Sequence, residues 1–222
     1  MSIMNIPYIP SGVLGRYSFM DDASVVLDSF PAAHLHPTSW CTAAQHVSAR
    51  FALAYDRENI YIKYYVNEPV VKAFYLSPND PVYNDSCVEL FIAFDDDINY
   101  YNLEFNCAGT CLGQYGSDRD NREFLPAAML HEIKHVTTLR SVSGRGVAWE
   151  MTVAIPLRVF AFHPQLALSG TSARINAYKC GDGLDEPHYL CWNQVKSDVP
   201  DFHRYDSFNG VMFTLSEEFS VD

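Results

Sequence analysis

The sequence is poor in basic residues. Its 222 residues include 15 lysines and arginines against 27 aspartates and glutamates, which leaves a formal net charge of −12 at pH 7. A negative field of this size repels the phosphates of nucleic acids and the anionic headgroups of membranes. We therefore expect neither a nucleic acid nor a membrane surface among the partners of this acidic protein.

Long apolar runs and targeting signals are also missing. No stretch reaches the roughly 18 apolar residues that a membrane-spanning helix needs. Residues 1–15 have neither the basic segment nor the continuous apolar segment of a signal peptide. We expect a soluble protein whose default compartment is the cytoplasm, and these patterns leave export open.

Several catalytic and nucleotide-binding motifs are absent. The sequence has no glycine-rich phosphate loop, no GxSxG elbow and no HExxH segment. It also has no CxxC pair, which argues against a structural zinc site. The spacing of its six cysteines matches no small secreted framework, so we expect them to be reduced and mostly buried.

Two further patterns bear on metal binding. His131 and His135 would lie about 13 Å apart on one face of a strand, too far to share a metal ion. The run Asp95, Asp96 and Asp97 offers the hard oxygens that calcium prefers, but aspartate is equally common in solvated turns. We expect no cofactor, with a structural calcium ion as the one alternative left open.

Apolar residues that alternate with period two dominate the sequence. Residues 47–55 and 60–66 predict a hairpin around a turn at 56–59, and similar runs occur at 86–106, 147–155, 175–180, 188–195 and 211–215. About nine or ten short strands with this spacing predict an all-β, antiparallel β-sandwich of jelly-roll-like form. We expect one domain over residues 1–222, with 1–27 packed on it as an N-terminal extension.

The most informative pattern lies within residues 86–106. Two strands there each carry one apolar face, formed by Val88, Leu90, Ile92 and Phe94 and by Tyr101, Leu103 and Phe105. If both faces meet the same core, Glu89 lies on the outer face with Glu104, directly opposite it for the tightest turn. Like charges so placed destabilise the pair unless a cation, an arginine or ligand hydroxyls lie between them.

This glutamate pair admits two functions. The first is a small glycoside hydrolase that uses Glu89 and Glu104, because retaining glycosidases hold two carboxyl groups about 5–5.5 Å apart. The other is a binding site for a polyol, which needs a flat ring and several converging polar groups. The candidates for such a site are Trp192, Glu89, Glu104, Asn106, Arg119, Arg122, Asn176 and Lys179. The alternative for Trp192 and Phe202 is that both are ordinary core residues.

Four segments resemble carbohydrate-binding modules of family 9. Tyr-Asn-Asp-Ser-Cys-Val-Glu-Leu-Phe at 83–91 is similar to that family's Asp-Xaa-Val-Glu-Ile-Phe strand, and residues 101–109 resemble its next strand and turn. Residues 149–156 resemble its Trp-Glu to Ile-Pro segment, and 192–210 its closing tryptophan and Phe-Gly hairpin. The resemblance spans residues 28–215.

This resemblance implies a jelly-roll-like sandwich that binds sugar without chemistry. Family members hold the reducing end of a glycan between two tryptophans, and some bind calcium structurally. Glu89 stands where the family has a sugar-binding glutamate, and Glu104 where it has an arginine. His203 falls at or near the later clamp tryptophan, and Tyr83 or a neighbouring aromatic would replace the earlier one.

Our leading hypothesis is therefore a non-catalytic module that binds a saccharide or similar polyol. The resemblance also implies association with glycan-degrading enzymes. The alternatives are the small hydrolase described above and a structural or protein-interaction domain without a sugar ligand.

Overall fold

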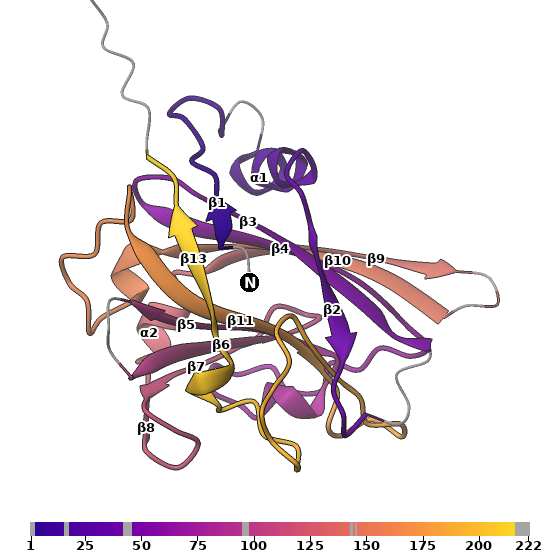
Figure 1. Ribbon diagram of the computed structural model, residues 1–222. Coiled ribbons are helices and arrows are strands. Elements are labelled where there is room, and N and C mark those ends of the chain that lie inside the picture. The colour runs from indigo at the N-terminus through magenta and orange to yellow at the C-terminus, as the bar shows by residue number, and fades with distance from the viewer. Residues whose placement is uncertain are drawn as a thin grey trace, which may run out of the picture.

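One of the two sheets, called the back sheet below, has five antiparallel strands. The computed structural model describes residues 3–15, 18–41, 46–94, 98–142, 144 and 146–215. The back sheet has the order β2-β3-β4-β10-β9 (Figure 1). Its strands are β2 (Ala33–Pro37), β3 (Ser48–Tyr55), β4 (Asn59–Glu68), β10 (Gly146–Pro156) and β9 (Lys134–Val142).

The front sheet carries the site described below. Its order is β8-β7-β6-β5-β11, and β12 and β13 share the remaining edge of β11. These strands are β8 (Arg122–Phe124), β7 (Cys111–Gly116), β6 (Tyr100–Asn106), β5 (Cys87–Phe94), β11 (Ser172–Cys180), β12 (Tyr189–Cys191) and β13 (Asn209–Phe213). A short parallel strand, β1 (Met4–Ile6), adds to β13, and β12 also pairs with β2, which joins the two sheets at one edge.

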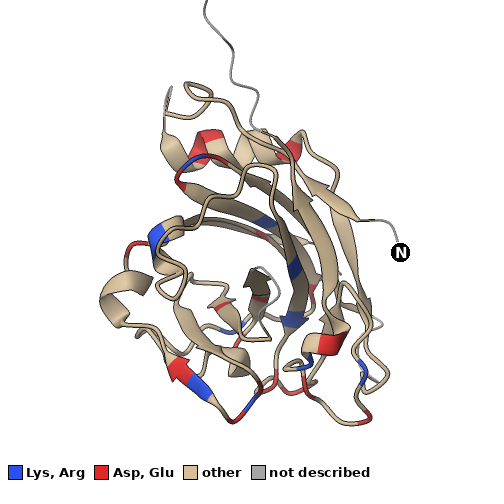
Figure 2. Ribbon diagram, turned by 60° about the vertical axis from the view of Figure 1, so that its left-hand side comes forward, with Lys and Arg blue, Asp and Glu red and all other residues tan. Residues whose placement is uncertain are grey.

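The predicted all-β class and sandwich architecture are confirmed. Facing each other, the two curved sheets enclose the core (Figures 1 and 2). The hairpin predicted around residues 56–59 is present as β3 and β4. The described part of the chain holds thirteen strands instead of nine or ten. The strands outside the predicted runs are β1, β2, β7, β8 and β9. Of these, β1 and β8 have three residues each, too few to show an alternating pattern.

One continuous cluster of buried side chains fills the space between the sheets. Its largest members are aromatic, and include Phe51, Tyr64, Phe94, Tyr101, Phe105 and Trp149. Each fully buried side chain of this size contributes roughly 1.5–3 kcal/mol through the water it no longer orders. The strands alternate with period two, so the same burial forces the intervening residues of β5 and β6 onto the outer face of the front sheet.

Helices are few among the described residues. Helix α1 (Phe19–Asp28) packs on the outer face of the back sheet, where its Ala23 and Leu27 meet Ala52 and Ala54. The alternation of strands does not predict this helix, and the small alanines of β3 make room for it. The second helix, α2 (Ala127–Leu130), is a single turn, and three 3-10 turns cover Val82–Asn84 (η2), Leu157–Val159 (η3) and Tyr205–Ser207 (η4). None of the helices in the described residues is both long and apolar enough to cross a membrane.

A buried ion pair links the two sheets. The Lys179 ammonium lies 3.0 Å from a carboxylate oxygen of Glu68 and also donates to the carbonyl oxygen of Cys180 and to Nε2 of His188. Trp149 Nε1 donates to the other Glu68 oxygen at 2.6 Å. Burial would raise the pKa of Glu68, but Lys179 and these hydrogen bonds outweigh it and lower that pKa to about 2.

We predict that Lys179→Met lowers the free energy of unfolding by about 3–5 kcal/mol, because it leaves the Glu68 carboxylate buried without its counter-charge. The matched control is Lys196→Met, which breaks the exposed 3.9 Å pair with Asp206 and should cost at most about 1 kcal/mol. Urea denaturation of both variants measures the difference. Equal losses in the two variants would show that the buried pair does not support the fold.

Candidate functional site

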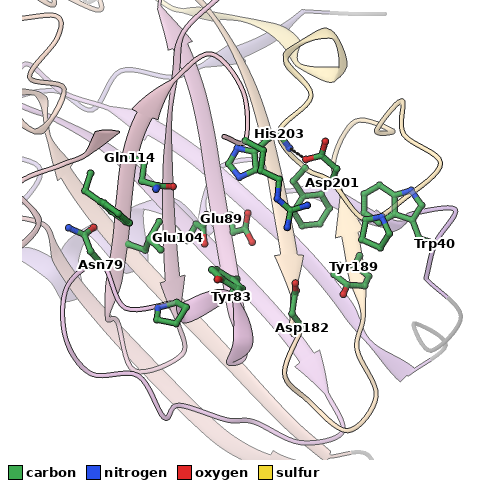
Figure 3. A pocket seen from close by; sticks show the side chains of 16 residues that line it. Trp40, Asn79, Tyr83, Glu89, Glu104, Gln114, Asp182, Tyr189, Asp201 and His203 are labelled. Carbon is green, nitrogen blue, oxygen red and sulfur yellow. Dashed lines mark hydrogen bonds between the residues drawn. The ribbon is translucent and has the colours of Figure 1, made fainter. Parts of the chain in front are cut away.

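A pocket of about 430 Å³ opens on the outer face of the front sheet. Figure 3 shows Glu89 and Glu104 side by side on neighbouring strands, with Asn79 and Gln114 to one side and His203, Asp201 and Trp40 to the other. The other lining residues are Pro81, Tyr83, Leu112, Arg119, Phe124, Asp182, Tyr189, Pro200 and Phe202. The strands supply the floor, and segments that are far apart in the sequence supply the walls.

The floor consists of the predicted glutamate pair. Glu89 on β5 is the direct register partner of Glu104 on β6, so that prediction is confirmed. Their residues are only 3% and 4% exposed. Glu89 Oε1 accepts a hydrogen bond from the Cys180 thiol at 2.9 Å, and Glu104 Oε1 accepts one from Asn102 Nδ2 at 2.8 Å. Glu104 Oε2 has no hydrogen-bond partner among the described residues.

Burial changes the acidity of both carboxyl groups. It raises the pKa of Glu89 well above its ordinary value, and the neighbouring Glu104 raises it further. Burial also raises the pKa of Glu104 to about 7, although the Asn102 hydrogen bond and the nearby Arg122 partly oppose this. Near neutral pH the pair therefore carries fewer than two negative charges.

The two arginines proposed as ligand-binding residues differ in their contacts. Arg122, on β8, donates to Asn102 Oδ1 through Nε at 3.0 Å and Nη2 at 2.6 Å. It also donates to the carbonyl oxygens of Tyr100 and Gly116 and lies 4.3 Å from the centre of the Tyr100 ring. Arg122 thus positions Asn102, which in turn holds Glu104. Arg119, in contrast, is exposed and lines the pocket.

One wall of the pocket is aromatic. Phe202 stacks on Tyr178 with ring centres 4.0 Å apart, and it contacts Trp40 at 5.6 Å and Tyr189 at 6.1 Å. Next to it the His203 ring packs on Phe91, and its Nδ1 lies 3.0 Å from the Tyr100 hydroxyl. Burial lowers the pKa of His203 to about 3, so its ring is uncharged at neutral pH. Tyr83, from η2, is 39% exposed and presents another ring to the pocket.

Five of the residues proposed from the sequence thus meet in one pocket, namely Tyr83, Glu89, Glu104, Arg119 and His203. Trp192 does not line it. Its ring packs edge-on against Phe51, 5.8 Å away, at the main core. This is the alternative placement considered for Trp192 in the sequence.

Three other proposed residues hold the structure together instead of lining the pocket. Lys179 points between the sheets to Glu68, because it shares the inward face of β11 with Ile175 and Ala177. Asn106 donates to the Tyr75 carbonyl oxygen and to Asp85, and it accepts from the backbone of residues 108 and 110. Asn176 donates to the carbonyl oxygens of residues 193 and 207. Asn106 and Asn176 are thus hydrogen-bonded to loops that also bury them.

Sequence reasoning missed Trp40, Asp182, Tyr189, Asn79 and Gln114. Only Gln114 had a usable signal, because it pairs with Asn102 in the register of β6 and β7 and so lies on the same outer face. The others come from loops or very short strands, whose direction no alternating pattern shows. The calcium site considered at Asp95, Asp96 and Asp97 lies outside the described residues.

Comparison with known proteins is decisive for the family. The family model described as "Carbohydrate-binding family 9" matches residues 21–213. The chain belongs to carbohydrate-binding family 9. It is therefore a non-catalytic carbohydrate-binding module by family, as its motifs implied. None of the curated protein sequences is significantly similar to it.

Solved structures resemble this family 9 module over nearly its whole length. A candidate carbohydrate-binding protein from Bacteroides uniformis is 28% identical, with a TM-score of 0.81 over 96% of this chain and 98% of its own. A family 9 module from Caldicellulosiruptor kristjanssonii in complex with cellotriose is 13% identical, with a TM-score of 0.64 over 100% and 98%. The module from the same organism in complex with glucose is 12% identical, with a TM-score of 0.60 over 99% and 100%. At these identities, the last two show a shared fold.

We predict that Glu104→Gln stabilises the module above about pH 7 by on the order of 2 kcal/mol, because it removes a carboxyl group whose ionised form the fold disfavours. A raised pKa means that the folded state loses stability as pH rises from the ordinary value of 4.5 towards about 7. The gain should therefore disappear in acid. Thermal melting across this pH range tests it, with Glu123→Gln, an exposed glutamate on β8, as the control. A pH-independent gain would contradict the assigned cause.

Proposed function

We propose that the pocket on the front sheet binds one saccharide unit through Glu89, Glu104, Gln114 and Arg119. The observation that carries this is the combination, in one pocket, of an aromatic wall and a buried acceptor that no described residue satisfies. Sugar hydroxyls are donors as well as acceptors, so they satisfy carboxylate oxygens that no protein group reaches. A volume of about 430 Å³ also lies within the range usual for small-ligand sites.

The aromatic wall supplies the apolar half of the recognition. Trp40, Tyr189 and Phe202 are half-buried, so they are fixed in position yet retain open ring surface. The flat C–H face of a sugar ring stacks on such a surface, while its hydroxyl edge points to the glutamates. The complexes of the two Caldicellulosiruptor modules with cellotriose and glucose support this ligand class. We also propose that the module associates with a glycan-degrading enzyme.

We predict that sugar binding changes tryptophan fluorescence through Trp40. Of the three tryptophans, Trp149 is buried in the core and Trp192 packs on Phe51, whereas Trp40 lines the pocket. In a titration with mono- and disaccharides, Trp40→Phe should remove most of the saturable signal. Trp192→Phe should leave most of it. The reverse pattern would move the site away from this pocket.

Glu89→Gln separates binding from catalysis. If the module is a binder, the change weakens affinity by about tenfold to a hundredfold, the cost of one charged hydrogen bond. If Glu89 and Glu104 were a hydrolytic pair, the same change would abolish turnover of aryl glycosides and leave affinity largely intact. Calorimetry and a chromogenic assay, with Glu123→Gln as control, distinguish the two. Absence of both binding and turnover in the parent would favour a protein-interaction domain.

A further inference from the structure

The charges of the pocket are unbalanced. Glu89, Glu104, Asp182 and Asp201 all line it, and Arg119 is the one cationic side chain among the lining residues. Asp201 already accepts a hydrogen bond from the backbone of His203, and His203 itself is neutral near pH 7. The lining of the pocket therefore offers a ligand four carboxyl groups against one cation.

Cations near the glutamates are engaged elsewhere. The Arg122 guanidinium donates its hydrogen bonds to Asn102 and to backbone carbonyl oxygens of β6 and the β7–β8 turn. Lys179 lies on the other face of β11 and pairs with Glu68. The space directly between the two carboxyl groups thus receives no positive charge from the described residues. Glu104, on the pocket floor, also has a buried acceptor, Oε2, without a hydrogen bond from the described residues.

We propose that this pocket prefers a saccharide with a free amino group, whose ammonium lies between Glu89 and Glu104. This inference rests on the proposed function and adds the class of sugar. Directly opposed residues in an antiparallel pair have Cβ atoms about 4.5–5.5 Å apart, so one ammonium reaches both carboxylates. It offers three N–H donors as well as a charge.

A neutral sugar satisfies this pair only in part. A hydroxyl group donates one hydrogen bond and brings no charge that would balance the ionised pair. An ammonium both fills the unmet acceptor and balances the charge of the pair as it ionises, and charge-assisted hydrogen bonds are roughly twice as strong as neutral ones. An N-acetylated sugar lacks the charge and two of the donors, so it should gain nothing from the pair.

Calorimetry with matched sugars tests this. Glucosamine, galactosamine and mannosamine are each compared with the parent hexose and with the N-acetyl derivative, below the pKa of the sugar amine. EDTA is present so that a divalent cation cannot replace the ammonium. At least one amino sugar should bind about tenfold or more tightly than its parent hexose, and its N-acetyl derivative should not. Repeating the titration in two buffers should show proton release with the amino sugar, because its charge ionises the glutamate pair.

The variant Glu104→Gln should reduce the affinity ratio of amino sugar to hexose to near one, while Glu123→Gln should preserve it. The inference would be overturned if the parent protein bound the amino sugar and the hexose with equal affinity, or if the affinity ratio were unchanged in Glu104→Gln. Either result would leave the proposed sugar site intact. No binding of any sugar in the panel would overturn the proposed function, and this inference with it.

Discussion

The pairing of β5 with β6 is the constraint on which the site depends. Each strand must turn its apolar side chains towards the core between the sheets, and an antiparallel ladder then leaves one register in which both do so. That register sets Glu89 opposite Glu104 on the outer face. The repulsion between these two residues is thus a consequence of core packing, and the fold retains it because the aliphatic and aromatic faces contribute far more.

A supporting layer keeps the pair in place without neutralising it. The Cys180 thiol donates to Glu89, and Asn102, itself held by Arg122, donates to Glu104. Each glutamate therefore has one oxygen tied to the protein. Positioned but incompletely satisfied groups of this kind are typical of binding sites, where a ligand completes the hydrogen bonding.

The loops decide how much of the outer face a ligand can reach. Residues 193–208 and 72–86 cross this face and bury its two ends. Their carbonyl oxygens accept hydrogen bonds from Asn106 and Asn176. They also supply Phe202, which joins Trp40 and Tyr189 in the aromatic wall beside the glutamates. The same segments thus remove two polar side chains from the site and supply part of its apolar surface.

The sequence by itself determined the β-sandwich class, the hairpin of β3 and β4, the opposed glutamates and the resemblance to family 9. These features follow from period-two alternation and local motifs, which act over a few residues. The inward direction of Lys179 was also readable, because it continues the apolar face of Ile175 and Ala177. Only the tertiary structure decided that Trp40, Asp182 and Tyr189 meet at the pocket while Trp192 does not. Those placements depend on loops and short strands, whose paths are set by long-range packing and carry no periodic signal.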